Sequence, residues 1–163
     1  ILAAVASALG ERAKGLPAGV QAAVVAFDEP TQVLASLTGD RALLAKAVDG
    51  LVVAEAAEGS RLDLGLTVAR RELAGPTRQP SARPAVVVLS DGTSTRAPTA
   101  DEVAKAAAPL LQAGTPIWAI ALGPDADAAW LAAAAGEARV LRATDAIELD
   151  AALTRIERAL RAP

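Results

Sequence analysis

Apolar residues recur along the chain with two spacings, which predict helices and strands. Apolar positions three or four residues apart predict helices at residues 1–15, 40–48, 61–73, 99–113, 125–135 and 145–160. Short apolar or alternating runs bounded by Gly, Pro or Asp predict strands at residues 20–27, 31–37, 85–89, 116–122 and 139–141. From residue 60 onward strands and helices alternate, which favours a mostly parallel, doubly wound α/β sheet with helices on both faces.

The pattern also predicts how some elements are placed. Only Asp28-Glu29-Pro30 links the first two strands, too short for a crossover helix, so we expect an antiparallel pair at one edge. Strand 85–89 is continuously apolar, which is typical of burial on both faces. The expected buried stripes of helices 40–48 and 145–160 are, respectively, Leu43, Leu44, Ala47, Val48 and Leu51, and Ile147, Leu149, Leu153, Ile156 and Leu160.

Composition narrows the chemistry available to this chain. Its 163 residues suit a single domain, 1–163, and 53% of them are hydrophobic but only 2% aromatic, which predicts an aliphatic core. The absence of His and Cys excludes histidine bases, thiolate nucleophiles, disulfides and zinc–sulfur sites. A metal site must therefore use oxygen ligands, which favours Mg²⁺, Ca²⁺ or Mn²⁺.

Charge and hydropathy argue against nucleic-acid binding and against a transmembrane segment. The net charge is −3, and neither a dense Lys/Arg stripe nor stacking aromatics are present, so we expect no nucleic acid. A transmembrane helix needs about 20 consecutive apolar residues. The apolar runs of this chain are short, so we expect no transmembrane segment.

Two residues are placed where a parallel sheet binds ligands, outside the carboxyl ends of its strands. Asp91 directly follows the apolar strand 85–89, although Asp91-Gly92 could equally form a simple turn. Ser60 precedes the helix 61–73, and with Asp63 it fits the S-x-x-D capping pattern. A capping role and a ligand role for Ser60 are compatible, because a hydroxyl has more than one lone pair.

Motifs of known enzymes do not fit. The phosphate-binding G-x-G-x-x-G and P-loop patterns and the G-x-S-x-G elbow are absent. The segment LSDGT is similar to the D-x-D-G-T start of haloacid-dehalogenase-type phosphatases, but Leu89 stands where the nucleophilic aspartate is required. A phosphatase or hydrolase that uses Asp91 in another way is the least favoured interpretation, and we expect no catalytic residues.

The order of motifs resembles a von Willebrand factor A domain of the bacterial type, over nearly the whole chain. The resemblance rests on the segments VAFDEPTQVLASL, GSRLDLGL, AVVVLSDGTST and the closing ATDAIELDAALTRI. It implies a Rossmann-like sheet of about six strands with helices on both faces. It also implies a metal-ion-dependent adhesion site (MIDAS) made of a D-x-S-x-S loop, a Thr from a second loop and an Asp from a third.

By this resemblance Asp91 matches the third-loop Asp, and Ser60 takes the place of the Thr, keeping the hydroxyl. The D-x-S-x-S loop and the central strand before it are not in this sequence, so we expect residues before Ile1, or a strand supplied from elsewhere. The cation implied is Mg²⁺, with Mn²⁺ or Ca²⁺ as alternatives.

The resemblance implies a module that binds a protein partner, whose acidic side chain completes the cation's coordination. The alternative is a structural domain of the same fold with a degenerate, metal-free site. Many bacterial members face outward from the membrane, which implies an extracytoplasmic or membrane-tethered location.

Overall fold

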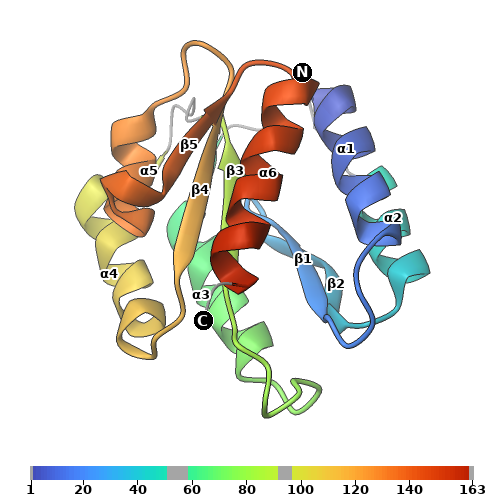
Figure 1. The fold of residues 1–163 in the computed structure, drawn as a ribbon. Helices are drawn as coiled ribbons and strands as arrows, with labels where there is room; N and C mark the ends of the chain where they lie inside the picture. Colours follow the sequence, from blue (N-terminus) through green and yellow to red (C-terminus); the bar gives the residue numbers. More distant parts are fainter. Residues whose placement is uncertain (1, 51–58, 92–96, 162–163) are drawn as a thin grey trace.

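The computed structural model describes residues 2–50, 59–91 and 97–161. Its elements are, in chain order, α1 (Leu2–Lys14), β1 (Ala22–Ala26), β2 (Gln32–Thr38), α2 (Arg41–Asp49), α3 (Leu62–Leu73), β3 (Val86–Ser90), α4 (Ala100–Gln112), β4 (Ile117–Leu122), α5 (Ala128–Ala135), η1 (Glu137–Arg139), β5 (Val140–Ala143) and α6 (Ala146–Arg161). Every predicted helix and strand is present, with bounds shifted by a few residues, and the α/β class is confirmed (Figure 1).

The described strands form two sheets. β3, β4 and β5 pair in parallel in the order β3-β4-β5, while β1 and β2 form the predicted antiparallel pair as a separate sheet. β1 and β3 share no ladder within the described ranges. The expectation of a further strand from outside this sequence stays a prediction.

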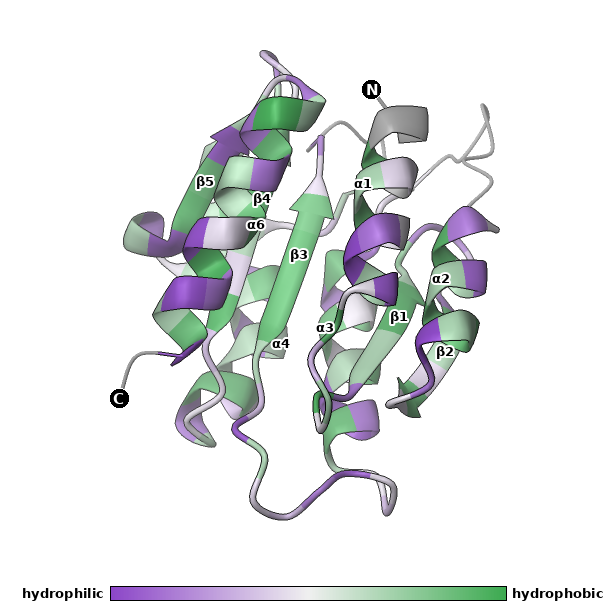
Figure 2. Ribbon diagram, turned by 45° about the vertical axis from the view of Figure 1, so that its right-hand side comes forward, coloured by the Kyte–Doolittle hydropathy of each residue, from purple (hydrophilic) through white to green (hydrophobic). Residues whose placement is uncertain are grey.

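Helices cover both faces of the parallel sheet (Figure 1). One face packs Ala119 and Ala121 of β4 against α3, α4 and α5, and the other packs Ile120 and Leu122 against α1 and α6. β4 is buried almost throughout because it is the central strand of the three. Figure 2 shows the hydrophobic strands between helices whose outer faces are hydrophilic. α2 packs with α1 against the β1–β2 pair through Leu44 and Ala45.

Local capping explains where two helices begin. The carboxylate of Asp40 accepts hydrogen bonds from the backbone N–H groups of Ala42 and Leu43, at the residue where the sequence predicts that this helix begins. Thr99 and Glu102 form a reciprocal capping box at the start of α4. These bonds satisfy backbone donors that the first turn of a helix leaves without partners.

Two helix residues that the sequence predicts to be buried are exposed. Leu43 is 54% exposed, because α2 turns Leu44, Ala45 and Val48 inward instead. Ile147 is 81% exposed, because the buried stripe of α6 starts at Leu149.

β3 is not buried on both faces, since Val87 is 37% exposed. β3 lies at an edge of its sheet, where neighbours cover it on fewer sides than β4. Leu51, predicted to be buried, lies outside the described residues.

None of the described helices combines the length and apolar content that crossing a membrane requires.

Candidate functional site

Asp91 lies where the sequence predicts, immediately beyond the carboxyl end of β3. Ser90, the last residue of β3, is buried and pairs with Ala121 of β4, so the strand fixes the backbone up to Asp91. Asp91 itself is exposed at the edge of the sheet. Its carboxylate is therefore placed where parallel α/β sheets bind ligands.

Ser60 is held against the residues that follow β1. It forms an isolated antiparallel bridge with Asp28, and the N–H of Arg61 donates to the carbonyl oxygen of Phe27 at 2.6 Å. These backbone contacts fix the start of α3 beside the carboxyl end of β1. The arrows of β1 and β3 point toward the same end of the molecule in Figure 2, so Asp28, the bridge partner of Ser60, and Asp91 both follow strands that end on the same side.

The capping prediction for Ser60 is wrong. α3 begins at Leu62, its N-cap is Arg61, and Arg61 makes no side-chain capping bond. Asp63, the other half of the predicted S-x-x-D pattern, instead accepts from Arg61 through both carboxylate oxygens, at 3.0 Å from Nε and 2.8 Å from Nη2. The sequence pattern did not anticipate that an adjacent guanidinium would occupy the carboxylate.

Arg61 and Asp63 form an ion pair at the start of α3. The hydrogen bonds from Arg61 lower the pKa of Asp63, and the same bonds, with the charges of Asp63, Glu29 and Glu102, raise the pKa of Arg61.

The donor chemistry of Ser60 and Asp91 fits a hard divalent cation. Carboxylate and hydroxyl oxygens are the ligands that Mg²⁺, Ca²⁺ and Mn²⁺ prefer. Within the described residues there is no group of three or more acidic side chains that could bind a metal ion on its own. A cation here would therefore use few protein carboxylates and several hydroxyls or waters. Ser60 and Asp91 stay predicted ligands.

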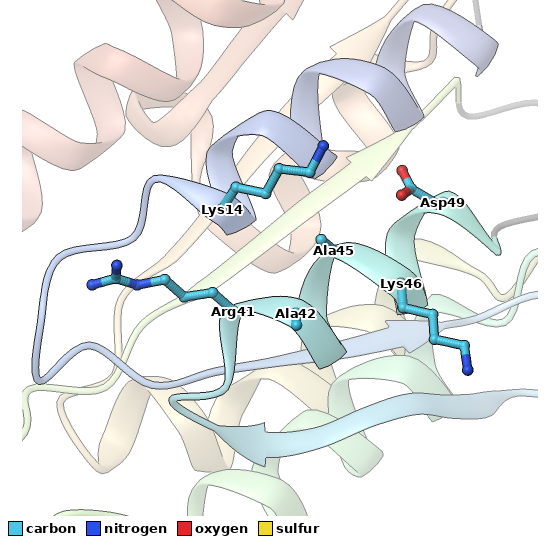
Figure 3. A pocket seen from close by; sticks show the side chains of 6 residues that line it. All are labelled: Lys14, Arg41, Ala42, Ala45, Lys46 and Asp49. Carbon is cyan, nitrogen blue, oxygen red and sulfur yellow. The ribbon is translucent and has the colours of Figure 1, made fainter.

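A shallow cleft of about 550 Å³ lies elsewhere, between the last turn of α1 and α2 (Figure 3). It is lined by Lys14, Arg41, Ala42, Ala45, Lys46 and Asp49. Lys14 is paired with Glu11 at 2.8 Å, and Asp49 brings a further negative charge to the rim. Because its charges are mixed and its floor is two alanines, the cleft offers little chemistry for selecting a ligand.

The chain matches the family model of the von Willebrand factor type A domain over residues 2–155, and no curated protein matches it. Proximal thread matrix protein 1 from the mussel byssus is 20% identical with a TM-score of 0.77, covering 95% of this chain and 41% of that one. The chain thus spans about two fifths of the mussel protein. A further structure of that protein, which has a zinc-occupied MIDAS motif, gives a TM-score of 0.73.

Two further structures share the fold. The vWF domain of the type V pili tip protein Mfa5 from Porphyromonas gingivalis is 14% identical, with a TM-score of 0.78, covering 98% of this chain and 88% of that one. Manganese-loaded TRAP from Plasmodium vivax is 17% identical, with a TM-score of 0.73, covering 91% and 63%. Because the family model spans nearly the whole of its length, the chain belongs to the von Willebrand factor type A domain family.

Proposed function

We propose that this domain binds a protein partner through a divalent cation, with Asp91 and Ser60 among the cation's ligands. The observation that carries the proposal is the exposed carboxylate of Asp91 at the carboxyl end of β3, on the side of the molecule where Ser60 is fixed beside β1. The mussel structure with a zinc-occupied MIDAS motif and the manganese-loaded TRAP structure, which share this fold, support a cation in general. Mg²⁺ is the cation we propose here.

The chemistry assigns separate tasks to the two residues. Asp91 supplies a negative charge, and Ser60 supplies a neutral oxygen from a residue whose backbone is paired with Asp28. A divalent cation held by one carboxylate keeps positive charge, so it attracts a further carboxylate. An acidic side chain of the partner is therefore the group we expect to complete the coordination. No nucleophile or general base is needed, and the family match indicates no catalytic class.

Calorimetric titration with Mg²⁺ and Mn²⁺ tests the proposal. The native protein should bind the cation, and Asp91→Asn should weaken binding by about tenfold or more, because it removes the charged ligand. Glu137→Gln is the matched control, since it removes one charge from an exposed carboxylate that precedes β5, at the opposite ends of the strands. Ser60→Ala should weaken binding less than Asp91→Asn.

The partner's contribution is tested with a short peptide that contains one glutamate and with its glutamine counterpart. The glutamate peptide should bind only when the cation is present, and the glutamine peptide should not bind. If the native protein gives no heat with either cation, the domain is a structural one with a degenerate site, which is the alternative interpretation.

A further inference from the structure

Gly65 occupies a crowded position in α3, one turn beyond Ser60. A Cβ placed on Gly65 would lie 2.7 Å from Cβ of Phe27 and 3.2 Å from its Cγ. Carbon atoms in favourable contact are about 3.5–4.0 Å apart, so the added atom would overlap the base of the Phe27 side chain. The absence of a side chain at residue 65 is what allows Phe27 to lie against α3.

Phe27 is the same residue whose carbonyl oxygen accepts from Arg61, and its neighbour Asp28 forms the bridge with Ser60. The segment 27–28 therefore contacts the start of α3 in two ways: the base of the Phe27 side chain lies on Gly65, and a backbone bridge, of which the Arg61–Phe27 hydrogen bond is part, joins Asp28 to Ser60. Phe27 also packs against the core cluster that contains Leu62 and Leu66. Phe27 cannot move away from Gly65 without straining the backbone contacts of Ser60.

We infer that Gly65 is a positioning residue for Ser60, acting through Phe27; the inference rests on the proposed cation site. Relieving the overlap of an alanine at residue 65 requires a displacement of roughly 0.8–1.3 Å between α3 and Phe27, given the contact distances of carbon atoms. Metal ligands tolerate errors of only about 0.2 Å in their distances. A displacement of that size at the start of α3 therefore removes the Ser60 hydroxyl from a productive position.

Gly65→Ala is the test and Gly10→Ala is its matched control. Gly10 is also a buried glycine inside a helix, but a Cβ there would meet Asp49 Oδ1 at 2.9 Å, the far end of a flexible side chain. Both substitutions bring the same gain in helix propensity. We expect Gly65→Ala to weaken Mn²⁺ binding by up to about tenfold, no more than Ser60→Ala does, and Gly10→Ala to change it less than about twofold, because only the first displaces a ligand.

A second readout needs no metal. Amide hydrogen exchange should show faster exchange of the Arg61 N–H in Gly65→Ala, since the bond to Phe27 is weakened, while Gly10→Ala leaves it unchanged. If Gly65→Ala does not fold, Phe27→Ala probes the same contact from its other side and should also weaken Mn²⁺ binding and speed that exchange.

The measurements distinguish a failure of the inference about Gly65 from a failure of the proposed function. If the native protein binds Mn²⁺ and a folded Gly65→Ala binds it equally well, the inference about Gly65 is overturned and the proposed function stands. If the native protein binds no Mn²⁺, the proposed function fails and the positioning role fails with it.

Discussion

The side chain of Arg12 joins the first and last helices of the described chain, and its removal gives a stability prediction that can be worked from contacts. From α1 the guanidinium donates to the Asp150 carboxylate at 2.7 Å, to the Asp150 carbonyl at 3.0 Å and to Thr154 Oγ1 at 2.7 Å, all on α6. It also pairs with Glu157. Partial burial alone would lower the pKa of Arg12, but the hydrogen bonds to Asp150 and Glu157 outweigh it and raise the pKa.

The size of the stability loss depends on how far the side chains in these contacts are exposed to solvent. The Arg12 side chain is 23% exposed, but those of Asp150 and Glu157 are 64% and 45% exposed, so each ion pair contributes about 0.2–1 kcal/mol. The hydrogen bonds to the Thr154 hydroxyl and the Asp150 carbonyl add about 0.5–1.5 kcal/mol each. Arg12→Ala should therefore lower the free energy of unfolding by about 2 kcal/mol, which is about 4–8 °C in Tm for a chain of this size.

Thermal and urea unfolding measure this loss directly. Arg155→Ala, which removes an exposed arginine from α6 that forms no ion pair with a described residue, should cost less than about 0.5 kcal/mol. Combining Arg12→Ala with Glu157→Gln should show a coupling energy of about 0.5–1 kcal/mol that shrinks in 1 M salt. An Arg12→Ala variant that melts like the native protein would refute the reasoning.

Two further predictions concern the surroundings of the site. Trp130 Nε1 donates a buried hydrogen bond of 2.8 Å to the Pro98 carbonyl oxygen, so Trp130→Phe should cost about 2–3 kcal/mol, compared with less for the half-buried Trp118→Phe; equal losses in urea unfolding would contradict this. The Arg61 hydrogen bonds hold the pKa of Asp63 below its ordinary value of 3.8, so their stabilisation is complete above that pH and is lost as the pH falls through the lowered pKa. The stability difference between native protein and Asp63→Asn should accordingly be constant near neutral pH and vanish in acid, and a difference that persists at pH 2 would argue against it.

The sequence predicted elements best where local chemistry decides them. The starts of the helices predicted at 40–48 and 99–113 and the apolar strand predicted at 116–122 depend on residues close together in the chain, and the structure confirms all three. The position of Asp91 at a strand end was predictable for the same reason, since an apolar strand directly precedes it.

Features that depend on distant residues were not predictable. The exposure of Leu43 and Ile147 depends on which face of each helix meets its neighbours, and periodicity leaves that face uncertain by one position. The contacts of Arg12 join residues 138 or more positions apart.

The candidate site also contains contacts that the sequence did not predict. The sequence shows a complete S-x-x-D capping pattern at Ser60 and Asp63, but in the structure Asp63 pairs with Arg61 and the N-cap of α3 is Arg61. The role of Gly65 could not be predicted from the sequence, because the sequence does not show that Phe27 lies against this glycine.

Paramagnetic broadening by Mn²⁺ is the most direct measurement of the central claim, that Asp91 and Ser60 hold a divalent cation at the carboxyl ends of the strands. In an amide NMR spectrum with a trace of Mn²⁺, signals of Leu62 and Ser90 should broaden first, while those of Gly75 and Gly114, beyond the far ends of α3 and α4, stay sharp. The selective broadening should disappear in Asp91→Asn. Uniform broadening, or a pattern that Asp91→Asn leaves unchanged, would contradict the claim.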